Sequence, residues 1–151
     1  MVWRLLKSNR PEIGTEFWPN QDGSSTASIR LAGVGFDKHY WQACPGIVEI
    51  SDRGKWITIT AHLKYASANN NDGVVQIWKT YADGKIEQPC NMTDGAWYTP
   101  NANGFESGYI MGWSNSGFNE QTNFYVDNFK VSETPLKNIP SPPRNASFVT
   151  P

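Results

Sequence analysis

The chain has 151 residues, 13 of them basic and 14 acidic, with a formal net charge of −1 and a mean hydropathy of −0.54. This length suits one domain with a hydrophobic core of its own. The balanced charges lack the Lys/Arg stripe of a nucleic-acid-binding protein, and no apolar run approaches the roughly 18 residues of a membrane span. The sequence therefore predicts neither a nucleic-acid partner nor a membrane span.

Aromatic residues make up 13% of the chain, whereas charged residues supply only 18%. Thirteen Gly and ten Pro interrupt the sequence every few residues. This composition is typical of a β-rich, turn-rich domain, often one that handles sugars or surfaces. We expect most of the seven Trp residues to fill the core and a few to remain available for a ligand.

No stretch shows a convincing 3.6-residue apolar period, so little helix is expected. Alternating segments separated by Gly, Pro, Asn and Asp clusters predict β-strands instead. The predicted strands are residues 2–7, 27–32, 46–51, 56–65, 74–81, 108–113 and 123–132. Strands at this spacing indicate an all-β fold, an antiparallel two-sheet β-sandwich or jelly roll.

We assign the sandwich domain to residues 1–132. Residues 133–151, "ETPLKNIPSPPRNASFVTP", carry five prolines that cannot donate to a β-ladder, which predicts a Pro-rich linker. Its "PSPPRNASFV" resembles the opening of a fibronectin type III module, which implies a larger parent protein. Two cysteines, Cys44 and Cys90, flank the central strands. A disulfide between them would stabilise the fold by roughly 4 kcal/mol, and a pair of buried thiols is the alternative.

The segment "GKWITITAHLKYASANNNDGVVQIWKTYADGK" reads as two alternating strands joined by a polar turn. Because side chains alternate faces along a strand, one face is aliphatic and packs inward. The opposite face gathers the candidate ligand-binding residues Trp56, His62, Lys64, Gln76 and Trp78. Sugar recognition needs this mixture, because a flat ring covers the C–H side of a pyranose while polar groups bind its hydroxyls. An ordinary solvated sheet face remains the alternative.

A second group of candidate ligand contacts comes from the loop "DGAWYTPNANG", which holds Trp97 and Tyr98. Exposed aromatic rings in loops serve binding more often than packing. We therefore expect both rings to lie at the surface and to add to the site.

The same hairpin and the ending "NFYVDNFKVSET" resemble segments of concanavalin A-like jelly rolls, especially those related to polysaccharide lyases. The resemblance covers about a third of the chain and implies a concave face that holds an oligosaccharide. It would place His62, Lys64, Gln76 and Trp78 on or beside that face. This chain is shorter than such relatives and lacks N-terminal strands that normally complete the sheets, so a neighbouring domain or second chain is an expected partner.

The sequence offers little support for catalysis. The two acidic residues closest to a glycosidase pattern, Glu12 and Glu16, lie four residues apart across a glycine and do not form the paired carboxylates of that chemistry. A lyase base and acid could come from His62 and a tyrosine, but Tyr65 falls on the opposite face. No zinc-ligand spacing occurs, and no cofactor is expected. Residues 69–72 and 127–128 could supply oxygen ligands to Ca²⁺ or form polar turns without metal.

The leading prediction is a non-catalytic polysaccharide-binding domain of a secreted, extracellular or surface-exposed protein. One alternative is a structural or adhesive module of a surface assembly, such as a phage tail or virion. A polysaccharide lyase is the second alternative.

Overall fold

The computed structural model describes residues 3–6, 12–19, 21, 25–33, 36–98, 107–110, 126–127 and 129–136. Its elements are β1 (Trp3–Leu6), β2 (Glu12–Pro19), β3 (Ser25–Gly33), β4 (Phe36–Val48), the 3-10 helix η1 (Ile50–Asp52), β5 (Ile57–Lys64), β6 (Gly73–Tyr81), β7 (Ile86–Gly95) and β8 (Ser107–Ile110). The described part of the chain is thus mostly β-strand with almost no helix, and the predicted all-β class is confirmed.

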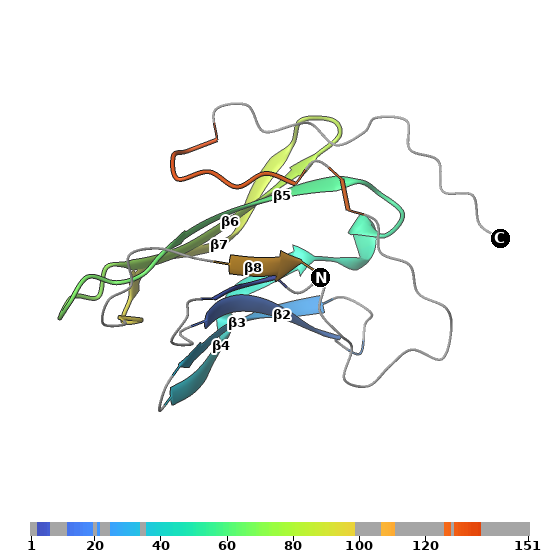
Figure 1. Cartoon of the computed structure of the whole chain (residues 1–151). Helices are drawn as coiled ribbons and strands as arrows, with labels where there is room; N and C mark the ends of the chain where they lie inside the picture. The colour runs from blue at the N-terminus through green and yellow to red at the C-terminus, as the bar shows by residue number, and fades with distance from the viewer. Residues whose placement is uncertain are drawn as a thin grey trace.

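The strands pair in two antiparallel sheets. One has the order β4-β3-β2-β1-β8, and the other has the order β5-β6-β7. Figure 1 shows the blue strands β2–β4 below the green and yellow strands β5–β7. A short connection that contains η1 leads from β4 to β5, so consecutive segments of the chain enter different sheets.

Several predicted strands differ from the structure. Residues 12–19 and 86–95 form β2 and β7, which were not predicted, and β4 begins ten residues before the predicted strand 46–51. The predicted strand 123–132 is wrong for residues 126–127 and 129–132, which have no regular secondary structure. Residues 111–113 and 123–125 of the predicted strands and residues 137–151 of the predicted linker lie outside the described residues.

Strand β7 escapes recognition because its pairing with β6 is irregular. The register steps by two residues on β6 and by three on β7 between the pairs Ile77↔Cys90 and Lys79↔Glu87, and it does so again between Gly73↔Gly95 and Val75↔Met92. Such bulges break the period-two alternation of side chains. Pro89 lies at the first bulge on the edge strand of this sheet, where the missing N–H of proline is tolerated.

The core of the described region joins the two sheets. Its buried members are Cys44, Ile47, Val75, Ile77, Cys90 and Trp97. Of the two alternatives for Cys44 and Cys90, the structure has the disulfide, which links β4 of the five-stranded sheet to β7 of the three-stranded one. Covalent and apolar contacts thus hold the inner face of β6 and β7 against β4.

Trp97 closes one end of this core. Its indole Nε1 donates a hydrogen bond to the Lys64 carbonyl oxygen at 2.8 Å, and its ring lies against the backbone of Gly73 and Gly95. A Cβ at either glycine would collide with the indole, so both positions require glycine for close approach. The exposed ring that the sequence suggested is a core side chain, only 3% exposed.

Candidate functional site

Strand β6 presents two different sets of polar groups on its two faces. Val75, Ile77 and Lys79 are buried, whereas Gln76 and Trp78 between them are half-buried. The predicted alternation is therefore confirmed for β6, with an aliphatic inner face that also includes a lysine, whereas burial does not alternate along β5 and Ala61, predicted for the inner face, is exposed. We name the solvent side of this sheet the outer face, formed by Thr60, His62, Gln76, Trp78 and Asn91.

A row of hydrogen bonds crosses the outer face from β5 to β7. The register pairs His62 with Gln76 and Gln76 with Asn91. His62 Nδ1 lies 3.0 Å from Gln76 Oε1, and Gln76 Nε2 donates to Asn91 Oδ1 at 2.8 Å. Because the amide oxygen only accepts, His62 Nδ1 carries the hydrogen of this contact. The row orients the exposed side chains of His62 and Asn91 and the half-buried side chain of Gln76.

Trp78 lies beside this row on the same strand. It pairs in register with Thr60 of β5, and the bulge of β7 lies on its other side. The side chain is half-buried, so part of the indole is accessible between a hydroxyl and the amide row. An aromatic ring next to oriented amides is the combination that the sequence predicted for this face.

Lys64 was predicted for the same face, but its ammonium is engaged at the end of the strand. Lys64 Nζ lies 2.8 Å from Asp72 Oδ2 and 3.3 Å from the Asp72 carbonyl oxygen. Asp72 also accepts the backbone N–H of Ser67 at 2.6 Å and the Ser67 hydroxyl at 2.8 Å. The hydrogen bond from Lys64, followed by those from Ser67, lowers the pKa of the Asp72 carboxyl well below its ordinary value.

The other predicted residues are distributed differently. Trp56 is half-buried just before β5, near the opposite end of the strand from Lys64. Tyr98 is 43% exposed, as expected, but Trp97 next to it is a core side chain. The structure therefore brings His62, Gln76 and Trp78 together and separates them from Trp97.

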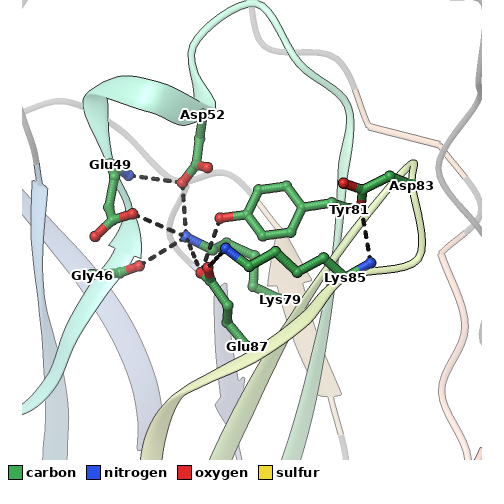
Figure 2. A network of polar contacts seen from close by, with 8 residues as sticks. All are labelled: Gly46, Glu49, Asp52, Lys79, Tyr81, Asp83, Lys85 and Glu87. Atoms are coloured by element: carbon green, nitrogen blue, oxygen red, sulfur yellow. Dashed lines mark hydrogen bonds and ion pairs between the residues drawn. The ribbon is translucent and has the colours of Figure 1, made fainter.

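The inner face carries the second set of polar groups, which we name the Lys79 network. Its members are Gly46, Glu49, Asp52, Lys79, Tyr81, Lys85 and Glu87 (Figure 2). Lys79 is the centre, with a side chain that is 0% exposed against 2% for Asp52. Its Nζ lies 3.0 Å from Asp52 Oδ2 and 3.1 Å from Glu87 Oε2.

Further contacts complete the shell of the lysine. Lys79 Nζ donates to the Gly46 carbonyl oxygen at 3.1 Å and lies 3.7 Å from Glu49 Oε2. Gly46 reaches this position with a φ of +73°, a conformation that favours glycine. The hydroxyl of Tyr81 donates to Glu87 at 2.9 Å, and the Tyr81 ring lies 5.2 Å from Lys79 Nζ. The buried cation therefore has several oxygen partners.

The ionisation of the network follows from these contacts. Burial opposes the charge of Lys79, yet hydrogen bonds with Tyr81 and Asp52 outweigh it and raise the pKa of the ammonium above its ordinary value. Burial would also raise the pKa of Asp52, but the Glu49 N–H and Lys79 bring it below the ordinary value. Lys79 thus stays protonated and supplies neither a base nor a nucleophile. The network is a structural ion cluster.

Sequence reasoning missed Lys79 and Asn91. The alternation "VVQIWK" places Lys79 with Val75 and Ile77, so its inward direction was available from parity alone. Asn91 could be placed only after β7 and its bulges were known. The carboxylate partner Asp52 belongs to η1, where no local pattern marks it.

No protein-family model, curated protein or solved structure matches the chain.

Within the described ranges, no group of three or more His, Cys, Asp or Glu side chains is placed to hold a metal ion. Among the same residues, no helix is long and apolar enough to cross a membrane. Residue 128 of the second predicted Ca²⁺ turn lies outside the described residues.

Proposed function

We propose that this chain is a non-catalytic carbohydrate-binding domain that holds a polysaccharide on its outer face. The observation that supports this proposal most strongly is the row of hydrogen bonds from His62 through Gln76 to Asn91, which lies next to the half-buried Trp78. Trp78 supplies a flat apolar surface for a sugar ring, and the amides and imidazole supply donors and acceptors for hydroxyl groups. Their mutual hydrogen bonds orient them before a ligand arrives, which reduces the entropy lost on binding.

The fold that we propose for this function is a two-sheet β-sandwich of the jelly-roll type. The Cys44–Cys90 disulfide and the core residues that it joins support it, because they hold the inner face of the three-stranded sheet against β4. The outer face then lies on the solvent side of the sandwich. A structural disulfide also favours an oxidising, extracellular location, which suits a domain of a secreted or surface protein.

A binder is favoured over a lyase by the positions of two residues. Tyr65, the nearest tyrosine in the hairpin, packs against the core cluster and not beside His62. The ammonium of Lys64, which would neutralise a uronate carboxylate in a lyase, is held by Asp72 at 2.8 Å. The outer face therefore offers His62 as a base, but among the described residues neither a tyrosine acid nor an unpaired lysine lies beside it as elimination requires.

The proposal is tested by affinity gel electrophoresis on a panel of soluble polysaccharides, with a glycan array for shorter ligands. We expect Trp78→Ala to weaken binding by about thirtyfold, the loss typical of a central aromatic contact, and Trp78→Phe to retain part of it. Lys55→Ala, an exposed change outside the sheet, is the matched control and should bind as the wild type. Circular dichroism must show the same fold for all variants.

Two outcomes would overturn the proposal. If the wild type binds no glycan, the structural or adhesive module becomes the better explanation. If the protein releases unsaturated uronate products, detected by their ultraviolet absorbance, the chain is a lyase.

A further inference from the structure

The outer face has few charges for a surface of this size. Among the described residues that point outward from β5, β6 and β7, Lys64 is the one lysine or arginine. Most of the other side chains of this face are uncharged, such as Thr60, Gln76 and Val74, and the exposed Asp94 lies in the β7 bulge opposite Val74. Whether this face attracts acidic glycans therefore depends on how Lys64 is used.

The Lys64 ammonium contacts both the carboxylate and the carbonyl oxygen of Asp72. The carboxylate lies 2.8 Å from the ammonium, and the Asp72 carbonyl oxygen accepts a second hydrogen bond at 3.3 Å. Both side chains remain partly exposed, at 48% and 39%, so the pair is a surface feature that a ligand would meet. The turn holds Asp72 in place, because its two carboxylate oxygens also accept the N–H and hydroxyl of Ser67.

We infer that the outer face selects neutral, hydroxyl-rich polysaccharides over polyuronates and sulfated glycans, and that Asp72 is the residue that sets this selectivity. The inference rests on the proposed function above. A carboxylate or sulfate approaching Lys64 must displace Asp72 or lie next to it, and like charges at this distance repel. A neutral sugar meets no such barrier, because its hydroxyls pair with uncharged groups that need no counter-ion.

The state of Asp72 is consistent with this inference. Its hydrogen bonds with Lys64 and Ser67 keep the pKa of the carboxyl far below its ordinary value. The carboxylate therefore remains charged through mildly acidic conditions, and Lys64 stays paired.

The first test compares polymers on the wild-type protein. Affinity gels would contain neutral polymers (laminarin, galactomannan or hydroxyethyl cellulose) or acidic ones (polygalacturonate, alginate or dextran sulfate). We expect retardation by at least one neutral polymer and none by the acidic polymers. Retardation should be the same from about 0.05 to 0.5 M NaCl, because screening affects only charged contacts.

The second test removes the carboxylate that pairs with Lys64. Asp72→Asn keeps a similar shape but removes the charge, and we expect it to gain affinity for polygalacturonate by about tenfold, the value of one charge-assisted hydrogen bond. That gain should vanish with added salt and in the double variant Lys64→Ala/Asp72→Asn. Lys55→Ala, an exposed change outside the sheet, is the control and should bind the neutral polymer as the wild type does.

The outcomes separate the two proposals. A wild type that binds only acidic polymers, with salt-sensitive affinity that Lys64→Ala abolishes, overturns the selectivity inference and leaves a glycan-binding domain. A wild type that binds no polymer overturns the proposed function and the inference with it. If Asp72→Asn does not fold, the polymer panel and Lys64→Ala still decide the question.

Discussion

Replacing Lys79 by methionine gives the sharpest test of how this fold is stabilised. The change keeps most of the side-chain volume but removes the cation that Asp52 and Glu87 contact at 3.0 and 3.1 Å. Asp52, with a side chain only 2% exposed, then keeps the Glu49 N–H at 2.9 Å as its contact in the network. Figure 2 shows that the carboxylates of Glu49 and Glu87 approach the same point, so their repulsion adds to the loss.

Removing one partner of a buried ion pair typically costs about 3–5 kcal/mol, and we expect Lys79→Met to fall in this range. Since small domains are stable by about 5–15 kcal/mol, the variant should be strongly destabilised. Its melting temperature should fall by about 6–20 °C at 2–4 °C for each kcal/mol. Urea denaturation followed by tryptophan fluorescence measures the free energy directly.

Two further variants test whether the loss of stability comes from the unpaired buried carboxylate of Asp52. Lys79→Met/Asp52→Leu removes both charges and should recover at least half of the loss, because buried ion pairs are replaced by apolar residues at little cost. Lys85→Met removes an exposed lysine that pairs with the same Glu87 at 2.6 Å and should cost clearly less than Lys79→Met, because solvent screens this pair. The reasoning is refuted if Lys79→Met costs less than about 1 kcal/mol, or if the double variant loses the sum of both single changes.

Three other measurements follow from the same contacts. Reducing the Cys44–Cys90 disulfide should lower the free energy of unfolding by about 4 kcal/mol for a loop of this length, and an unchanged denaturation midpoint with reductant would contradict this. Gly95→Ala should cost about 1–3 kcal/mol, because its Cβ would collide with the Trp97 ring, whereas Thr93→Ala on the same strand should not. Hydrogen bonds from Lys85, Lys79 and Tyr81 lower the pKa of Glu87 from 4.5 to about 2. Because the unfolded chain binds the proton first, this stabilisation is complete above about pH 4.5 and is lost as the pH falls toward 2. Glu87→Gln should flatten that acid limb.

The hairpin β5–β6 could be predicted because its signals agree at every level. Aliphatic and polar residues alternate in the sequence from Ile57 to Lys64, buried and half-buried residues alternate from Gly73 to Lys79, and a polar turn separates the two strands. The inward residues Ile59 and Leu63 pack against the core, although Ala61 between them is exposed. Local pattern and tertiary packing therefore favour the same register, and the outer-face position of His62, Gln76 and Trp78 follows from it.

The structure of β7 and the burial of Trp97 could not be predicted, because both depend on contacts with residues in other segments of the chain. β7 contains two bulges and a proline, so its alternation fails although it pairs with β6 along both ends and the middle of the strand. Trp97 lies in a segment without strand structure, and its ring can be buried only because Gly73 and Gly95 have no Cβ to collide with it. The loop position of Trp97 suggested a surface ring, because the sequence does not show which backbone a loop tryptophan will cover.

The outer and inner faces of the hairpin each contain a Lys–Asp pair, and the two pairs have different consequences. Lys64–Asp72 and Lys79–Asp52 have similar N–O distances, 2.8 and 3.0 Å, but only the second is removed from water. Solvent screens the exposed pair and leaves it little influence on folding, yet it determines which charge a ligand meets on the outer face. Desolvation makes the buried pair costly to break, while its position on the inner face keeps it away from any ligand bound outside. Asp72→Asn should therefore alter polymer preference with a nearly normal unfolding curve, and Lys79→Met should alter the unfolding curve with normal polymer preference. If Asp72→Asn and Lys79→Met each alter both polymer preference and the unfolding curve, the two faces are coupled through the sheet.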